Sequence, residues 1–264
     1  KIDYLSVFAG EDNVPEDTES AAIWKMIDPN LVVKKFGRKD NFWGPTGNEG
    51  PCGPTTEIYV DGIEVWNIVF NEYYQSKDGS LKPLDTKGVD TGMGLERLVK
   101  VIQKVPTVFD TDLFKPIMEV AQSRIVADHI RTSVFMISNG VTPSNTDRGY
   151  ILRRLLRRAY VKNKNVNPVI DAIMSHPSYK DLYTFAPNTK EVITQELEKF
   201  GKTLEDGLKQ VKKGADPFIL FTTYGLPLEI IKEVVPNVDE VKFQKQMEEH
   251  KQLSSTAGEN KFKN

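Results

Sequence analysis

The chain has 264 residues, a formal net charge of −2 and one cysteine, Cys52. This length suggests one large or two modest domains, at roughly 100–200 residues per domain. One cysteine excludes an internal disulfide and fits a reducing compartment, and with three scattered histidines we expect no zinc site. We find no signal peptide and no apolar run near the roughly 20 residues that span a bilayer, so we expect a cytoplasmic protein without a membrane partner.

The first 110 residues have the pattern of a mixed α and β structure. In chain order, we expect a strand at 4–8, a helix at 17–27, a loop rich in Gly and Pro at 41–54, a strand at 64–73, a turn at 77–80, a second strand ending near Val89 and a helix beginning near Met93.

After residue 116 the pattern becomes helical. Helices are expected at 123–137, 149–160, 188–211 and 238–253, and the polar end at 254–264 is expected to be frayed or disordered. On the first of these helices, one face carries the apolar residues Val126, Ile130, Val134 and Ile137. We therefore predict an α+β fold, with a sheet-containing domain at 1–118 and an all-helical domain at 119–264.

The strand at 64–73 has two different faces, because side chains alternate along a strand. One face carries Val65, Asn67, Val69 and Asn71, and the other carries Trp66, Ile68, Phe70 and Glu72. The second set predicts a core face near the centre of the strand. The first mixes apolar and amide groups, which suits the wall of a small polar pocket or, alternatively, a half-exposed strand with its amide in water.

The junction between the second strand and the next helix contains Asp90, Gly92, Gly94 and Arg97. The two glycines allow a ligand to approach the backbone, and a helix N-terminus favours phosphate. Many strand-to-helix turns share this pattern, so it is weak evidence by itself.

Segment 149–160 predicts an amphipathic helix with Arg153, Arg154, Arg157 and Arg158 on one half of its surface. No acidic residue interrupts 151–165, and like-charge neighbours on a helix cost roughly 0.2–0.5 kcal/mol each. A solvated helix face is one interpretation. A phosphate-binding face is the other, which we favour slightly because a polyanion would relieve the repulsion.

The segment Gly92-Met93-Gly94-Leu95-Glu96-Arg97 resembles motif 3 of the class II aminoacyl-tRNA synthetases. Other segments are similar, in order and spacing, to the alanyl-tRNA synthetase family: Asn41-Phe42-Trp43, Gly50-Pro51-Cys52-Gly53-Pro54, Val65-Trp66-Asn67-Ile68-Val69-Phe70, Asp128-His129-Ile130-Arg131, Asn139-Gly140-Val141, Arg148-Gly149-Tyr150 and Thr223-Tyr224-Gly225. The resemblance covers nearly the whole chain and implies part of a class II antiparallel sheet with helices.

This resemblance implies activation of alanine by ATP, bound with Mg²⁺, to alanyl-adenylate, followed by transfer to the 3′ end of tRNA(Ala). Arg97 and Asp90 would be the catalytic residues, with Arg97 near the adenine and γ-phosphate of ATP and Asp90 on the ammonium of alanine. The remaining implied contacts are Gly94 and Glu57 for ATP, and Trp43, Asn67, Val69 and Gly92 for alanine.

For tRNA, the resemblance implies recognition of a G·U wobble pair in the acceptor stem, read by Asn145 from the minor groove. The implied backbone contacts are Arg148, Arg153, Arg154, Arg157 and Arg158. Thr222 stands where the family usually has an aspartate that helps to read the wobble pair. Its hydroxyl can form a hydrogen bond but supplies no carboxylate.

Motifs 1 and 2 of class II synthetases and the zinc-containing editing domain are not recognised in this sequence. We therefore expect the C-terminal part of a catalytic core joined to a tRNA-recognition region, with a chain that carries motifs 1 and 2 as one conceivable partner. Two other functions stay open. One is an acceptor-stem-binding module without catalysis, and the other is a helical interaction protein with a relic sheet. Cys52 is expected to be a packing residue, because no histidine is near it in sequence.

Overall fold

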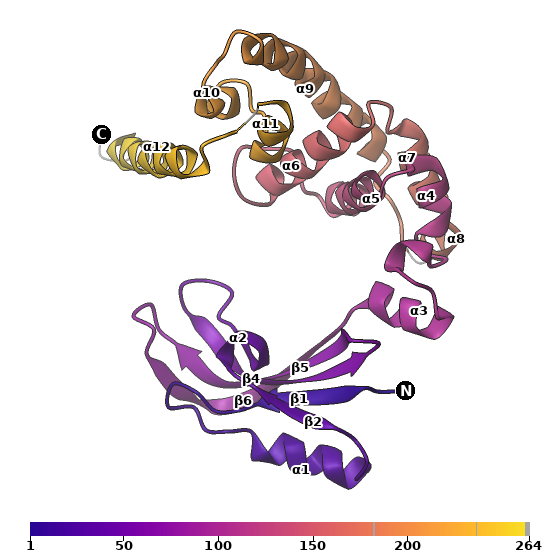
Figure 1. Cartoon of the computed structure of the whole chain (residues 1–264), viewed down its shortest axis with the longest axis vertical. Coiled ribbons are helices and arrows are strands. Elements are labelled where there is room, and N and C mark those ends of the chain that lie inside the picture. Colours follow the sequence, from indigo (N-terminus) through magenta and orange to yellow (C-terminus); the bar gives the residue numbers. More distant parts are fainter. Residues whose placement is uncertain (182, 236, 262–264) are drawn as a thin grey trace. The chain divides into compact units, whose positions relative to one another are not determined.

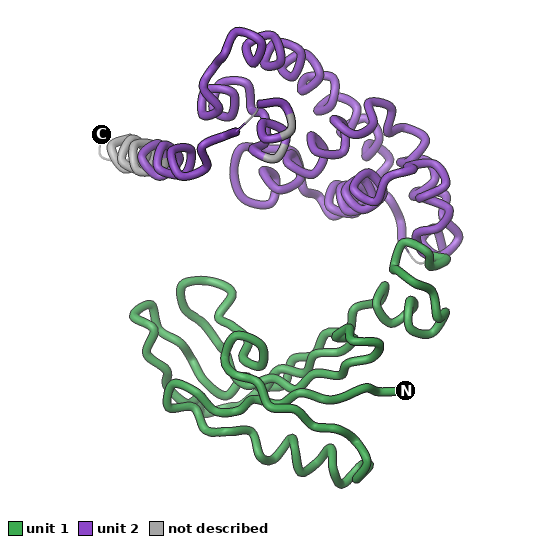
Figure 2. The backbone as a smooth tube through the Cα atoms, viewed as in Figure 1, with its two compact units in different colours: residues 1–112 green, residues 113–264 purple. Residues whose placement is uncertain are grey.

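A computed structural model describes the backbone of residues 1–181, 183–235 and 237–261. It contains two compact units, Lys1–Asp112 and Leu113–Asn264 (Figure 2). A sheet with helices forms the first unit and helices form the second (Figure 1), so the predicted α+β class is confirmed. Helix α4, Lys115–Ala121, belongs to the second unit and spans the predicted boundary between residues 118 and 119. The functional roles of the two predicted domains stay predictions.

Unit 1 contains a sheet and short helices. In chain order its elements are β1 Tyr4–Phe8, α1 Thr18–Ile27, β2 Val33–Phe36, α2 Arg38–Asn41, β3 Phe42–Trp43, β4 Gly50–Val60, β5 Ile63–Gln75, β6 Leu81–Met93, α3 Leu95–Gln103 and the 3₁₀ turn η1 Val108–Asp110.

The sheet has the strand order β2-β1-β4-β5-β6, with β3 paired to β4. The expectation of an antiparallel sheet is correct for every strand pair except β1 and β2, which are parallel. Helix α1 lies between these two strands in sequence. Parallel neighbours need such a crossover, because the chain must return to the same end of the sheet.

Helices α1 and α2 lie on opposite faces of the sheet (Figure 1). On the α1 face, Trp24 Nε1 donates to Thr56 Oγ1 at 2.8 Å. On the α2 face, Asn41 Nδ2 donates to Ser6 Oγ at 2.9 Å. The predicted core face of β5 was wrong, because Val65 and Val69 are buried, whereas Trp66, Ile68 and Phe70 are only partly buried.

A buried polar network fastens α2 to the sheet. Glu57 on β4 is 5% exposed, and its carboxylate accepts hydrogen bonds from Tyr59 Oη at 2.7 Å and Ser6 Oγ at 3.3 Å. Asn41 bonds both Ser6 Oγ and Thr55 Oγ1. Burial raises the pKa of the Glu57 carboxyl, and the hydrogen bond from Tyr59 opposes that rise.

The predicted loop at 41–54 contains strand β3 and the start of β4, so that prediction was wrong in part. Gly50, Pro51 and Cys52 pair with the end of β5, and the register shifts between Cys52 and Thr55. Prolines fit a strand at such a bulge, where a ladder hydrogen bond is missing. At Gly53, an added Cβ would lie 1.8 Å from the carbonyl oxygen of Phe70, so only glycine fits.

The described residues of unit 2 form helices joined by loops and turns. Its elements are α4 Lys115–Ala121, α5 Arg124–Ser138, α6 Asp147–Lys162, α7 Asn167–Met174, α8 Pro177–Lys180, α9 Thr189–Val211, α10 Pro217–Thr222, α11 Leu228–Val234 and α12 Glu240–Lys261. The predicted apolar face of α5 is buried, and α6 packs against both α5 and α9. Helix α12 extends to Lys261, so the predicted disorder at 254–261 was wrong, and residues 262–264 lie outside the described residues.

Replacing Gly53 with alanine should destabilise unit 1, because the new methyl group requires β4 and β5 to separate locally. We expect a loss of about 1–3 kcal/mol in the free energy of unfolding, as for other overpacked positions. Urea unfolding followed by tryptophan fluorescence measures this loss selectively, because Trp24, Trp43 and Trp66 all lie in unit 1.

The matched control is Gly88→Ala on β6, where the nearest atom to an added Cβ is Asn71 Cβ at 4.0 Å. This variant should stay within about 0.5 kcal/mol of the unmodified chain. Equal stability of the two variants would contradict the assigned role of Gly53.

Candidate active site and nucleic-acid interface

The pairing of β4, β5 and β6 places most of the predicted alanine-site residues on one face of the sheet. Asn67 on β5 lies between Glu57 on β4 and Gly92 on β6. Val69, two residues further along β5, lies opposite Asp90 on β6. Directly paired residues of antiparallel strands project to the same side, so these side chains share the α2 face.

The centre of this face has an unsatisfied polar atom. Oδ1 of Asn67 is buried and has no hydrogen-bond partner among the described residues. Val69 beside it is 6% exposed, and an added Cβ at Gly92 would meet no atom within 4 Å. A buried amide oxygen without a partner costs free energy, so the face is suited to a small ligand that donates a hydrogen bond.

Asp90 and Trp43 are more exposed than Asn67 and Val69. The Asp90 carboxylate is exposed, and its Oδ1 accepts a hydrogen bond from the backbone N–H of Thr91 at 2.8 Å. Trp43 is on β3, paired with Gly53 of β4, and is 37% exposed. An exposed carboxylate near a small apolar wall can hold a cationic group such as an ammonium.

Arg97 forms an ion pair with Glu64 on β5. It lies in the first turn of α3, which begins after Gly94, and its Nη1 contacts Glu64 O at 2.9 Å and Glu64 Oε2 at 3.1 Å. The Arg97 side chain is 50% exposed. An exposed pair of this kind contributes only about 0–1 kcal/mol, so a more highly charged anion could replace Glu64 as the partner.

In unit 2, five of the predicted tRNA-binding residues line one hollow of about 510 Å³. These residues are Asn145, Arg153, Arg154, Arg157 and Thr222. The other lining residues include Tyr150 on α6, Phe221 on α10, and Gln244 and His250 on α12. The hollow therefore combines cationic, amide and aromatic groups, which are the groups that contact phosphates and bases.

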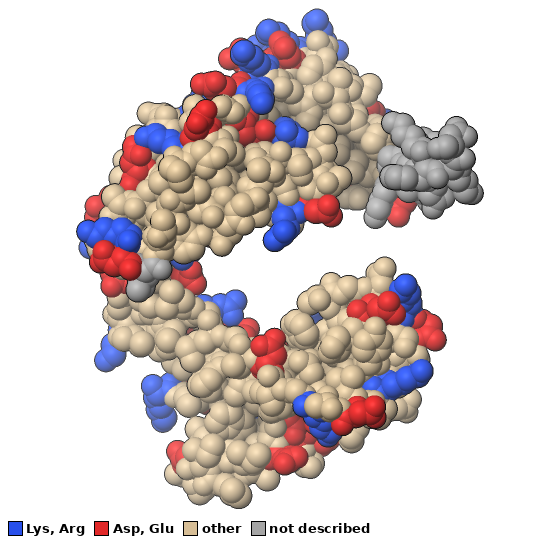
Figure 3. All heavy atoms as spheres, turned by 180° about the vertical axis from the view of Figure 1, so that it is seen from behind, with Lys and Arg blue, Asp and Glu red and all other residues tan. Residues whose placement is uncertain are grey.

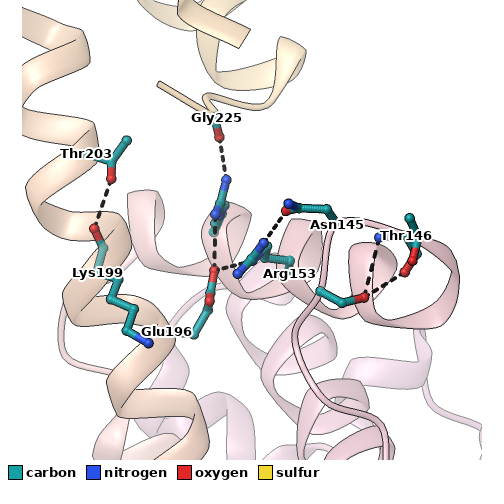
Figure 4. Close-up of polar contacts among 9 residues, drawn as sticks. Asn145, Thr146, Arg153, Glu196, Lys199, Thr203 and Gly225 are labelled. Atoms are coloured by element: carbon teal, nitrogen blue, oxygen red, sulfur yellow. Dashed lines mark hydrogen bonds and ion pairs between the residues drawn. The ribbon is translucent and has the colours of Figure 1, made fainter. Parts of the chain in front are cut away.

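Arg153 and Arg157 have a partner that local sequence did not predict. Glu196 on α9 accepts from Arg153 Nε at 2.9 Å and from Arg157 Nη2 at 3.2 Å (Figure 4). The side chains of Arg154 and Arg158 form no hydrogen bond or ion pair with any residue whose placement is described. The four arginines therefore divide into a pair bound to Glu196 and a second pair, of which Arg154 is exposed and Arg158 is partly buried.

Three predicted RNA contacts fit the hollow less well. Arg148 lines a separate hollow of about 470 Å³ together with Arg131 and Phe135. Arg158 lines neither hollow. Thr222 lines the first one, but its hydroxyl donates to Phe218 O of its own helix at 2.9 Å. The hydroxyl can therefore still accept a hydrogen bond from a ligand, but its own hydrogen is already donated.

On the face drawn in Figure 3, Lys and Arg side chains are interspersed with Asp and Glu. Within the described residues, no three His, Cys, Asp or Glu side chains come together as a metal site. None of the helices in the described part of the chain has the length and apolar character that crossing a membrane requires.

Glu196 is the residue that sequence reasoning missed. Its signal is its spacing, because Ile193, Leu197, Phe200 and Leu204 form the buried stripe of α9 and Glu196 lies within that stripe. A carboxylate on an apolar helix face needs a cationic partner when it is buried. The pairing with arginines 39 and 43 residues earlier could not be deduced from that spacing.

Residues 4–264 match the family model described as tRNA synthetases class II (A). The chain is 35% identical to an alanine–tRNA ligase of Borrelia hermsii, over 98% of this chain and 54% of that protein. It is also similar to the alanine–tRNA ligases of Thermotoga sp. at 38% and of Bacillus subtilis at 37% identity, each over 92% of this chain and 35% of the relative.

The chain thus spans about half the length of the first relative and about a third of the other two. The family match itself extends over both structural units, from the sheet to the last helix. The chain therefore belongs to the class II (A) tRNA synthetases.

Proposed function

We propose that this chain contributes to an alanine–tRNA ligase reaction, in which unit 1 binds alanine and ATP and unit 2 binds the acceptor stem of tRNA(Ala). The relatives described above carry the name alanine–tRNA ligase. The observation that carries the proposal is the unsatisfied Oδ1 of Asn67, next to Val69 and Asp90 on one face of the sheet. A pocket of this kind is needed by an enzyme that binds an amino acid and not by an RNA-binding module.

Alanine would lie with its methyl group against Val69 and its ammonium at Asp90. The ammonium has three donors, one of which can satisfy Asn67 Oδ1. Gly92 leaves space above β6, and Trp43 would close the outer edge of the site. Such a pocket excludes larger amino acids by size, but it rejects serine weakly because one added hydroxyl is difficult to exclude sterically.

ATP, as its Mg²⁺ complex, would bind at the start of α3. Gly94 precedes the first turn, whose N–H groups favour phosphate, and Arg97 lies in that turn. Arg97 would exchange Glu64 for the β- and γ-phosphates and stabilise the negative charge of the departing pyrophosphate. Glu57 is buried on the same sheet face, opposite Asn67, and would border the nucleotide.

RNA would bind at the hollow of unit 2. Arg154 and Arg158, together with Arg148, would contact phosphates, because cationic side chains that neutralise phosphates release the counterions of the polyanion. Asn145 and Thr222 would face the minor groove of the acceptor stem, where a G·U pair presents a pattern distinct from a Watson–Crick pair.

A second candidate function is acceptor-stem binding without amino-acid activation. The observation that favours it is that all the predicted RNA-contact residues lie within unit 2, which forms its own core. Amino-acid-dependent ATP–pyrophosphate exchange separates the two functions. Exchange with alanine supports the first, and RNA binding without any exchange supports the second.

Asp90→Asn should lower kcat/KM for alanine in ATP–pyrophosphate exchange by roughly 10- to 100-fold, since a hydrogen bond to a charged group contributes about 1.5–3 kcal/mol. The KM for ATP should change little. Asp85→Asn is the matched control, because Asp85 is an exposed carboxylate on the same strand. An equal decrease in both variants would show that Asp90 does not bind the ammonium.

The double variant Arg154→Ala/Arg158→Ala should weaken binding of acceptor-stem RNA regardless of its sequence. The slope of log Kd against log salt concentration should fall by about 2, roughly one for each phosphate that an arginine no longer neutralises. Fluorescence anisotropy with a labelled RNA duplex across a salt series measures both quantities.

Lys202→Ala provides the control, because Lys202 is an exposed cation on α9 that does not line the hollow. It should leave the slope near that of the unmodified chain. A double variant with an unchanged slope would contradict the phosphate-contact assignment.

A further inference from the structure

Glu196 is buried where two RNA-site elements meet. It is 6% exposed, and its Oε1 accepts from both Arg153 and Arg157 on α6. One carboxylate thus faces two guanidinium groups that are one helical turn apart. Because each cation would otherwise be partly buried beside another cation, the position of Glu196 determines where both side chains lie.

Arg157 connects this centre to the segment after α10. Its Nη1 donates to Gly225 O at 2.8 Å, and its guanidinium lies 5.0 Å from the ring centre of Phe200 on α9. Burial lowers the pKa of Arg157, and the Glu196 carboxylate opposes that change. Gly225 has φ +57°, and an added Cβ there would lie 2.5 Å from Arg157 Nη1. Glycine is therefore needed for this contact.

Arg153 connects the same centre to the loop before α6. Its Nη1 donates to Oδ1 of Asn145 (Figure 4). The loop packs closely on the helix, because an added Cβ at Gly149 would lie 2.2 Å from Ser144 Oγ. Ser144 Oγ in turn donates to Thr146 O at 2.9 Å. Asn145 is therefore held by its side chain and by its neighbours.

A continuous chain of contacts thus runs from Gly225 through Arg157, Glu196 and Arg153 to Asn145. Its two ends border the same hollow from different segments, and Thr222 lies three residues before one end. The separation between Asn145 and the segment around Thr222 is therefore set by a buried carboxylate rather than by either segment alone.

We propose that Glu196 is a positioning residue for reading the acceptor stem: through Arg153 and Arg157 it fixes the spacing between Asn145 and the Gly225 segment. This inference rests on the RNA-binding function proposed for unit 2. It assigns Arg153 and Arg157 chiefly to orientation, and it leaves Arg154 and Arg158 to contact phosphates. Removing the charge of Glu196 should therefore reduce discrimination between base pairs more than it reduces electrostatic affinity.

The test uses Glu196→Gln in the full chain, with two acceptor-stem duplexes that differ only in a G·U or a G·C pair. Glutamine keeps the size of the side chain but supplies no charge to two arginines. The ratio of the two Kd values should fall by about fivefold or more, as expected when one hydrogen bond that reads the base pair is removed. The salt slope of binding should stay at the value of the unmodified chain, because Arg154 and Arg158 remain.

Glu198→Gln is the matched control, since Glu198 lies two residues further along α9 and is exposed. It should preserve both the ratio and the slope. Should Glu196→Gln fail to fold by circular dichroism, Arg153→Lys replaces it. Lysine keeps the positive charge but lacks the planar fork that joins Glu196 to Asn145. The Arg153→Lys variant should lower the ratio of the two Kd values, while the salt slope of binding stays unchanged.

A folded Glu196→Gln or Arg153→Lys variant that keeps the full ratio overturns this inference and leaves RNA binding by unit 2 intact. An unmodified chain that binds both duplexes equally also overturns it, because the chain would then not distinguish the G·U pair from the G·C pair. An unmodified chain that binds neither duplex overturns the proposed RNA function together with the inference.

Discussion

The cost of burying a carboxylate shapes both units of this chain. Glu57 and Glu196 are each almost fully removed from water, at 5% and 6% exposure. Glu57 is surrounded by hydroxyl donors, which satisfy its oxygens while burial raises its pKa. Glu196 is instead paired with two arginines. An uncompensated buried charge is so unfavourable that the elements supplying these partners must be held in place.

These two solutions have different consequences for function. The hydroxyl network around Glu57 fastens α2 to β1 and β4, and β4 is the direct neighbour of the strand that carries Asn67. The ion pairs of Glu196 join α9, α6 and the Gly225 segment. A site built on such supports keeps its geometry before the ligand arrives, which reduces the free-energy cost of binding.

Local sequence predicted much of this fold. The strands around Tyr4 and Asn67, the helix that begins near Asp17 and the buried apolar face of α5 follow from alternation and helical periodicity. The predictions were wrong where the structure depends on backbone pairing between segments that are distant in the sequence. The Gly- and Pro-rich stretch before Thr55 extends β4, because its backbone pairs with the end of β5. The buried residues of β5 are Val65 and Val69, on the face opposite to the predicted one, and alternation alone could not indicate which face is buried.

The sequence by itself determined the family, the alternation that places Asn67 and Val69 on one side of a strand, and the arginine-rich helix. These are local properties, fixed by spacing of 2 or 3.6 residues. Only the tertiary structure decided which arginines are paired, because Glu196 lies 39 residues from Arg157 and 43 from Arg153. It also decided that Asn67 Oδ1 is buried without a partner among the described residues. Both results depend on which elements pack together, and packing is set by the whole chain rather than by any one segment.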